Sequence, residues 1–235
     1  MAQLKETIGK KSLLLLCINA TLGTGIFFLP ALGALYAGPA SLVSWLIMSA
    51  VAIFISLYFA ELISMFPRSG GVYDYAKEAF GDFPAFVVGW ISWIVANITI
   101  AMLIVGSIVY LLPGETFIVK MALSITFILL FNAISYRGID VSTKLIIFFG
   151  FMTVASLLML IVPGLFTIRP ENFYPFFVSP LPMILLATYF IAETFFGWET
   201  ATYLSEEIKD ARRTLPRMLV ISTIVIAAIS ILIAF

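Results

Sequence analysis

Long apolar runs, separated by short polar breaks, make up nearly the whole sequence. About seven of these runs reach the roughly 20 residues that a helix needs to cross a hydrocarbon core of about 30 Å. Backbone amides and carbonyls must be paired inside lipid, and the runs do not alternate as barrel strands do, so we predict helices. The predicted spans of this all-α integral membrane protein are 12–36, 40–65, 84–112, 117–135, 143–167, 180–204 and 217–235.

The overall composition agrees with lipid as the solvent. Of the 235 residues, 62% are hydrophobic and 11% are charged, whereas a soluble domain carries roughly 25% charged residues. The formal net charge is zero, which argues against a nucleic-acid partner. Histidine is absent, Cys17 is the single cysteine, and no carboxylate cluster has metal-ligand spacing. We therefore expect no enzyme activity, no cofactor and no metal site.

Basic residues predict the orientation of the chain. If the N-terminus is cytoplasmic and the spans alternate, all 13 basic residues except Lys120 and Arg169 fall on the cytoplasmic side. This asymmetry follows the positive-inside rule and predicts a multi-pass protein of the cell membrane. The polar loop 68–82 is interpreted either as an amphipathic helix at an inner gate or as a solvated connector.

The first span contains a segment of low helix propensity, Gly23-Thr24-Gly25. Each glycine costs about 1 kcal/mol relative to alanine inside a helix, so local unwinding is plausible there. An unwound stretch at this depth is tolerated only in a cavity or inside protein. It would offer amides to an anion and carbonyls to a cation, as an α-amino acid requires. Close packing of helices at small residues is the alternative.

The sixth span contains a second candidate break at Gly197, with Glu193 and Glu199 on either side. A carboxylate within a span costs several kcal/mol unless it is paired, hydrated or protonated, so it is a functional candidate. For Glu199 the alternative is a position near the inner end of the span, where it snorkels or caps a neighbour. Interrupted spans in corresponding positions of two halves indicate a transporter site near the midplane.

These motifs occur in an order that resembles the amino acid–polyamine–organocation (APC) superfamily of permeases. The matching segments are Gly23-Thr-Gly-Ile-Phe27 with Pro30, Pro67-Arg-Ser-Gly-Gly-Val-Tyr-Asp-Tyr75, Phe195-Phe-Gly-Trp-Glu199, and Ser205-Glu-Glu-Ile-Lys-Asp-Ala-Arg-Arg-Thr-Leu-Pro-Arg217. Ala211 departs from the family pattern, which usually has proline there. The resemblance implies a five-plus-five inverted-repeat fold. Residues 1–11 would be a cytoplasmic N-terminus, 12–167 the first repeat, and 180–235 the start of an incomplete second repeat.

The resemblance also implies a substrate site. The amides of Thr24, Gly25 and Ile26 would hold a substrate carboxylate, and the carbonyls of Thr21 and Phe196 would accept from its ammonium. The expected substrate-binding residues are Thr21, Gly23, Thr24, Gly25, Ile26, Asn97, Glu193, Phe195, Phe196 and Gly197.

Two of these residues leave their roles open. Glu193 stands where several relatives carry an aromatic gate residue, and its carboxylate favours either a cationic substrate or a coupling proton. Asn97 is expected either to contact the substrate or to bond between helices.

The expected function is therefore secondary active transport, as a permease or antiporter, of amino acids, polyamines or related amines by alternating access. The alternative is a truncated, non-transporting scaffold or a half-transporter that needs a partner. Proton coupling, sodium coupling and uncoupled exchange stay open, because Thr153 occupies the place of a lysine that some proton-linked relatives carry. Oligomeric state also stays open.

Overall fold

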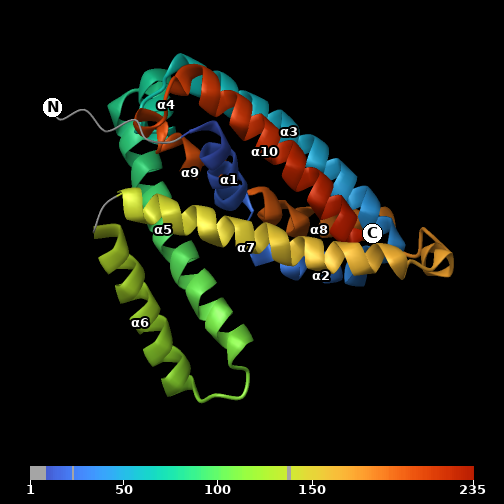
Figure 1. Ribbon diagram of the computed structural model, residues 1–235. Coiled ribbons are helices and arrows are strands. Elements are labelled where there is room, and N and C mark those ends of the chain that lie inside the picture. The colour runs from blue at the N-terminus through green and yellow to red at the C-terminus, as the bar shows by residue number, and fades with distance from the viewer. Residues whose placement is uncertain (1–8, 23, 137–138) are drawn as a thin grey trace. The chain divides into compact units, whose positions relative to one another are not determined.

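A computed structural model of the chain describes residues 9–22, 24–136 and 139–235, and the regular elements within them are α-helices and short 3-10 helices (Figure 1). The α-helices are α1 (Lys10–Thr21), α2 (Leu29–Ala37), α3 (Ser41–Met65), α4 (Val72–Phe80), α5 (Asp82–Leu111), α6 (Phe117–Tyr136), α7 (Ile139–Phe166), α8 (Leu181–Ile191), α9 (Trp198–Thr202) and α10 (Ala211–Ala234). The 3-10 helices are η1 (Thr24–Phe27), η2 (Gly38–Ala40), η3 (Pro170–Phe173), η4 (Ala192–Phe195) and η5 (Ser205–Glu207).

The chain divides into two compact units. One combines Met1–Gly71 with Ile147–Phe235, and the other is Val72–Ile146. We call them the broken-helix unit and the hairpin unit, because the first holds both interrupted spans and the second holds α5 and α6.

The core of the broken-helix unit is built on α3 and α10, which lie side by side along their lengths (Figure 1). Trp45, Leu219 and Ile226 are completely buried there. Buried serines on both helices allow close approach of the backbones, as small residues do in membrane proteins. Ser44 Oγ donates a hydrogen bond of 2.8 Å to the Ile184 carbonyl and so ties α3 to α8.

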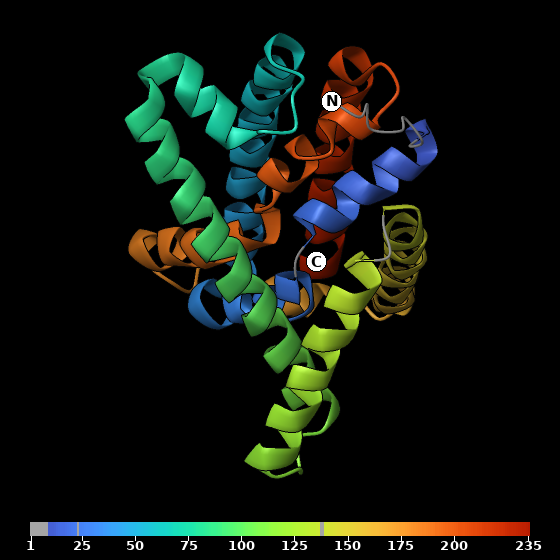
Figure 2. The same cartoon turned by 90° about the vertical axis from the view of Figure 1, so that its left-hand side faces the viewer.

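The hairpin unit consists mainly of α5 and α6, which run in opposite directions and meet at a short turn (Figure 2). Lys120 Nζ donates to the Pro113 carbonyl at 3.1 Å across this turn. The amphipathic helix α4 packs on α5, where the ring of Tyr73 covers Gly89. Most apolar side chains of α5 and α6 are exposed, as expected for a surface that faces lipid.

Six helical segments within the described residues are long and apolar enough to cross a membrane. They are Leu29–Met65, Asp82–Leu111, Phe117–Tyr136, Ile147–Phe166, Leu181–Thr202 and Ala211–Ala234, with Ser12–Thr21 as a shorter apolar helix. The predicted first span is divided between α1 and α2, which at 1.5 Å per residue are about 18 Å and 14 Å long. Neither is long enough to cross a bilayer alone, and α1 ends at an extended residue, Leu22, so the predicted interruption is confirmed.

One predicted boundary is wrong. The sequence suggested a loop through Pro216 and a last span from residue 217, but α10 begins at Ala211 and contains Pro216. Because Pro216 has no N–H group, the carbonyl of Arg212, four residues earlier, lacks its helical hydrogen bond. Arg212 is exposed, so water can solvate its carbonyl group, and the helix tolerates the Pro216 ring.

Candidate functional site

The first span is interrupted where the glycines predicted it. Helix α1 ends at Thr21, and Leu22 is extended with φ −81° and ψ 93°. The next helical turn starts at Thr24 and leads into α2 at Leu29. Gly23 and the side chain of Thr24 lie outside the described residues. The last carbonyls of a helix have no partner within it, so the end of α1 presents carbonyl oxygens at mid-span.

The sixth span is interrupted at Phe196 and Gly197. Helix α8 ends at Ile191, η4 follows, and Phe196 is extended with φ −83° and ψ 145°. Gly197 has φ +126°, a region that residues with a Cβ atom rarely enter. Helix α9 begins directly after it at Trp198.

The two interruptions meet in space. A Cβ atom built on Gly197 would lie 2.9 Å from the carbonyl carbon of Ala20 and 3.2 Å from the Cα atom of Thr21, and would overlap the Ala20 oxygen. The break in the sixth span therefore touches the end of α1, and α1 also packs against α9. Glycine is needed at position 197 both for its dihedral angles and for this close approach.

Glu193 makes a second connection between the interrupted spans. Its carboxylate lies against Gly25, because a Cβ atom on Gly25 would overlap Glu193 Oε2 and come within 3.1 Å of its Cδ atom. The same Cβ atom would lie 2.7 Å from Leu29 Cδ1. Gly25 and its neighbour Ile26 are buried. The structure thus brings together two of the residues that the sequence singled out separately.

Three buried side-chain oxygens at the interruptions have no hydrogen-bond partner among the described residues. They are Glu193 Oε2, Thr21 Oγ1 and Thr194 Oγ1, and both threonines are completely buried. An unsatisfied buried polar group costs about 1–3 kcal/mol, so these three atoms are candidates for bonding a molecule held at the interruptions. Sequence reasoning missed Thr194, although a polar residue beside Glu193 inside a span was a usable signal.

The remaining predicted residues behave differently from one another. Phe195 is completely buried, whereas Phe196 is 58% exposed, so the two adjacent rings do not share one environment. Asn97 belongs to the hairpin unit, is exposed, and donates from Nδ2 to the Trp93 carbonyl of its own helix at 2.8 Å. Its contact with a substrate stays a prediction.

Comparison with known proteins decides the family. The sequence profile described as amino acid permease matches residues 8–235. The chain belongs to the amino acid permease family. This confirms the resemblance drawn from the glycine motifs, and together with the six apolar helices it supports a multi-pass membrane protein.

Several curated relatives are similar to this chain over nearly all of its length. The methylthioribose transporter of Bacillus subtilis (strain 168) is 27% identical over 97% of this chain and 54% of its own. The branched-chain amino acid permease BcaP of the same organism is 26% identical over 94% and 52%. The cystine/glutamate transporter of Homo sapiens is 27% identical over 95% and 48%. The chain thus spans about half the length of these relatives.

The permease also has a polar clasp at the predicted cytoplasmic ends of α3 and α10. The Ser69 amide donates to Glu206 Oε1 at 3.3 Å, and the Glu206 amide donates to Ser69 Oγ at 3.2 Å. Arg212 Nε donates to the Ser64 carbonyl at 2.8 Å. The sequence analysis used Arg212 for topology and placed Ser69 and Glu206 in two family motifs, but it missed the reciprocal pair because its members are far apart in the chain.

Glu207 lies beside this clasp, outside the spans. Partial burial, followed by the neighbouring charge of Glu206, raises the pKa of the Glu207 carboxyl above its ordinary value of 4.5. The folded chain therefore binds a proton at Glu207 more tightly than the unfolded chain does.

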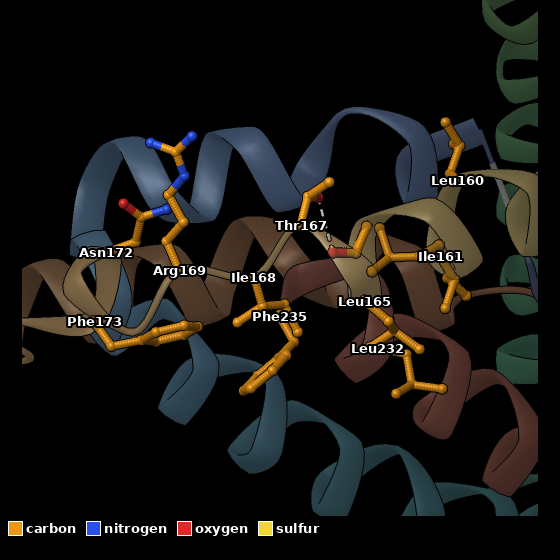
Figure 3. Close-up of a pocket in the computed structure, with 12 residues that line it drawn as sticks. Leu160, Ile161, Leu165, Thr167, Ile168, Arg169, Asn172, Phe173, Leu232 and Phe235 are labelled. Atoms are coloured by element: carbon orange, nitrogen blue, oxygen red, sulfur yellow. Dashed lines mark hydrogen bonds between the residues drawn. The ribbon is translucent and has the colours of Figure 1, made fainter.

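A cavity of about 300 Å³ lies elsewhere in the broken-helix unit, between the end of α7, η3 and the end of α10 (Figure 3). Arg169 and Asn172 extend on one side of it, and the rings of Phe173 and Phe235 pack 5.1 Å apart on another. Thr167 Oγ1 donates to the Gly164 carbonyl at 3.0 Å. Its lining includes none of the residues at the two interruptions, so it is not the predicted substrate site.

Proposed function

We propose that this permease is a secondary transporter that moves amino acids or related amines across the cell membrane by alternating access, with its N-terminus in the cytoplasm. The observation that carries the proposal is the contact between two interrupted spans, Gly197 against the end of α1 and Glu193 against Gly25. Non-helical backbone within a span is tolerated where it lines a binding site or is buried in protein. The names of the relatives support amino acids as one substrate class.

In the proposed site, the amides of Thr24, Gly25 and Ile26 face the acidic end of the substrate. The carbonyls of Thr21 and Phe196 face its ammonium group. Opposite partial charges at the ends of the half-helices suit these two groups. Coupling to a proton or to sodium is part of the proposal, with Glu193 as the proton-carrying candidate.

The test is uptake by liposomes that contain the 235-residue chain. Radiolabelled leucine, glutamate, arginine and polyamines are offered outside, with the unlabelled compound inside to drive exchange. We expect exchange of at least one compound above protein-free liposomes, and its loss in Gly197→Val, which cannot adopt φ +126° without strain. Gly106→Ala is the matched control, because a Cβ atom there meets open space.

The same liposomes distinguish the alternatives. A non-transporting scaffold would neither bind nor exchange any of these compounds. Binding without exchange would support the site and contradict alternating access by this chain. Addition of a pH or sodium gradient to the exchange assay then identifies the coupling ion.

A further inference from the structure

Glu193 lies in a long stretch of the chain that contains no basic residue. Residues 12–67, 145–168 and 170–208 contain no lysine, arginine or histidine. These ranges include η1 and α8, which contact the turn η4 that carries Glu193. The basic residues of α1 and α10 lie at the starts of those helices, at Lys10, Lys11, Arg212, Arg213 and Arg217. A carboxylate at this depth is stabilised only by a partner or by a proton, and the ammonium group of a bound substrate is a suitable partner.

The Glu193 carboxylate also lies against the interruption of the first span. Glu193 Oε2 is buried without a hydrogen-bond partner among the described residues, and it touches Gly25. Under the proposed function, Gly25 belongs to the part of the site that receives the carboxylate of an α-amino acid. The chain therefore has a carboxylate of its own beside the place proposed for the substrate carboxylate, and two carboxylates close together repel each other.

We propose that Glu193 supplies the negative group of the site, so that this permease prefers organic amines without an α-carboxylate over the corresponding α-amino acids. The ammonium of the amine pairs with the Glu193 carboxylate and with the carbonyls at the end of α1. Thr21 Oγ1 and Thr194 Oγ1, both completely buried and unpartnered among the described residues, are the nearby polar groups that can accept or donate further bonds. This inference rests on the proposed function, because it takes Gly25 as part of the substrate site.

The test compares each amine with its parent amino acid. Isoamylamine is paired with leucine, tyramine with tyrosine, and agmatine with arginine, so each pair differs only by the α-carboxylate. Binding is measured by competition or calorimetry on the 235-residue chain in nanodiscs, for the wild type and for Glu193→Gln, Glu193→Ala and Glu193→Asp. Glu61→Gln is the control, because Glu61 is an exposed carboxylate on α3.

The wild type is expected to bind each amine at least tenfold more tightly than its parent, which is about 1.4 kcal/mol. In Glu193→Gln and Glu193→Ala this ratio falls at least tenfold, through weaker amine binding and stronger amino acid binding. Glu193→Asp and Glu61→Gln keep the preference of the wild type. A thermal unfolding scan in the same nanodiscs shows whether each variant is folded.

The outcomes separate the inference from the proposed function. A wild type that binds leucine as tightly as isoamylamine overturns the inference and leaves an amino acid permease, and this measurement needs no variant. An unchanged ratio in folded Glu193→Gln overturns it as well. A folded wild type that binds neither amines nor amino acids removes both the proposed function and the inference.

Discussion

Replacing Gly197 with alanine tests whether the meeting of the two interruptions holds the fold together. The residue has φ +126°, and a non-glycine residue in a sparsely populated region costs about 1–3 kcal/mol. The added methyl group would also overlap the Ala20 oxygen and lie within 3.2 Å of Thr21 Cα. Both neighbours are backbone, so the end of α1 has to shift. We expect a total destabilisation of about 2–4 kcal/mol.

The measurement is the apparent unfolding temperature of the purified chain in detergent at a fixed scan rate. About 3 kcal/mol corresponds to a decrease of roughly 6–12 °C for a chain of this size. Gly106→Ala is the control, since a Cβ atom on this mid-helix glycine meets nothing within 4 Å and alanine favours a helix by about 1 kcal/mol. A Gly197→Ala variant as stable as Gly106→Ala would refute the close approach of the two spans.

Two further predictions concern the Ser69–Glu206 clasp and the neighbouring Glu207. Ser69→Ala and Glu206→Gln should each lower the free energy of unfolding by about 0.5–1.5 kcal/mol, because each weakens the reciprocal bonds. Each side chain accepts from the backbone amide of the other residue, so each substitution affects a different bond, and unchanged unfolding free energies in both variants would contradict the reciprocal pair. Glu207 binds its proton more tightly in the fold than when unfolded, so its contribution to stability is greatest below pH 4.5 and is lost as the pH rises through the raised pKa. Unfolding temperatures between pH 4 and 7 should therefore fall less steeply in Glu207→Gln than in the wild type, and equal slopes would contradict the raised pKa.

The spans and their interruptions could be predicted from the sequence because both depend on local quantities. The thickness of the hydrocarbon core sets the length of an apolar run, and the helix cost of Gly23, Gly25 and Gly197 acts wherever these residues stand. The glycine motifs also indicated the family. None of this required knowledge of which residues touch.

The contacts that make the site specific were decided only by the tertiary structure. Glu193 meets Gly25, and Gly197 meets Ala20, because distant helices cross at particular angles that no local pattern encodes. The same packing buries Phe195 while it exposes Phe196, although the two residues are adjacent and chemically identical. A sequence therefore shows where a membrane helix can be interrupted, but side-chain packing between helices determines which residues the interruption contacts.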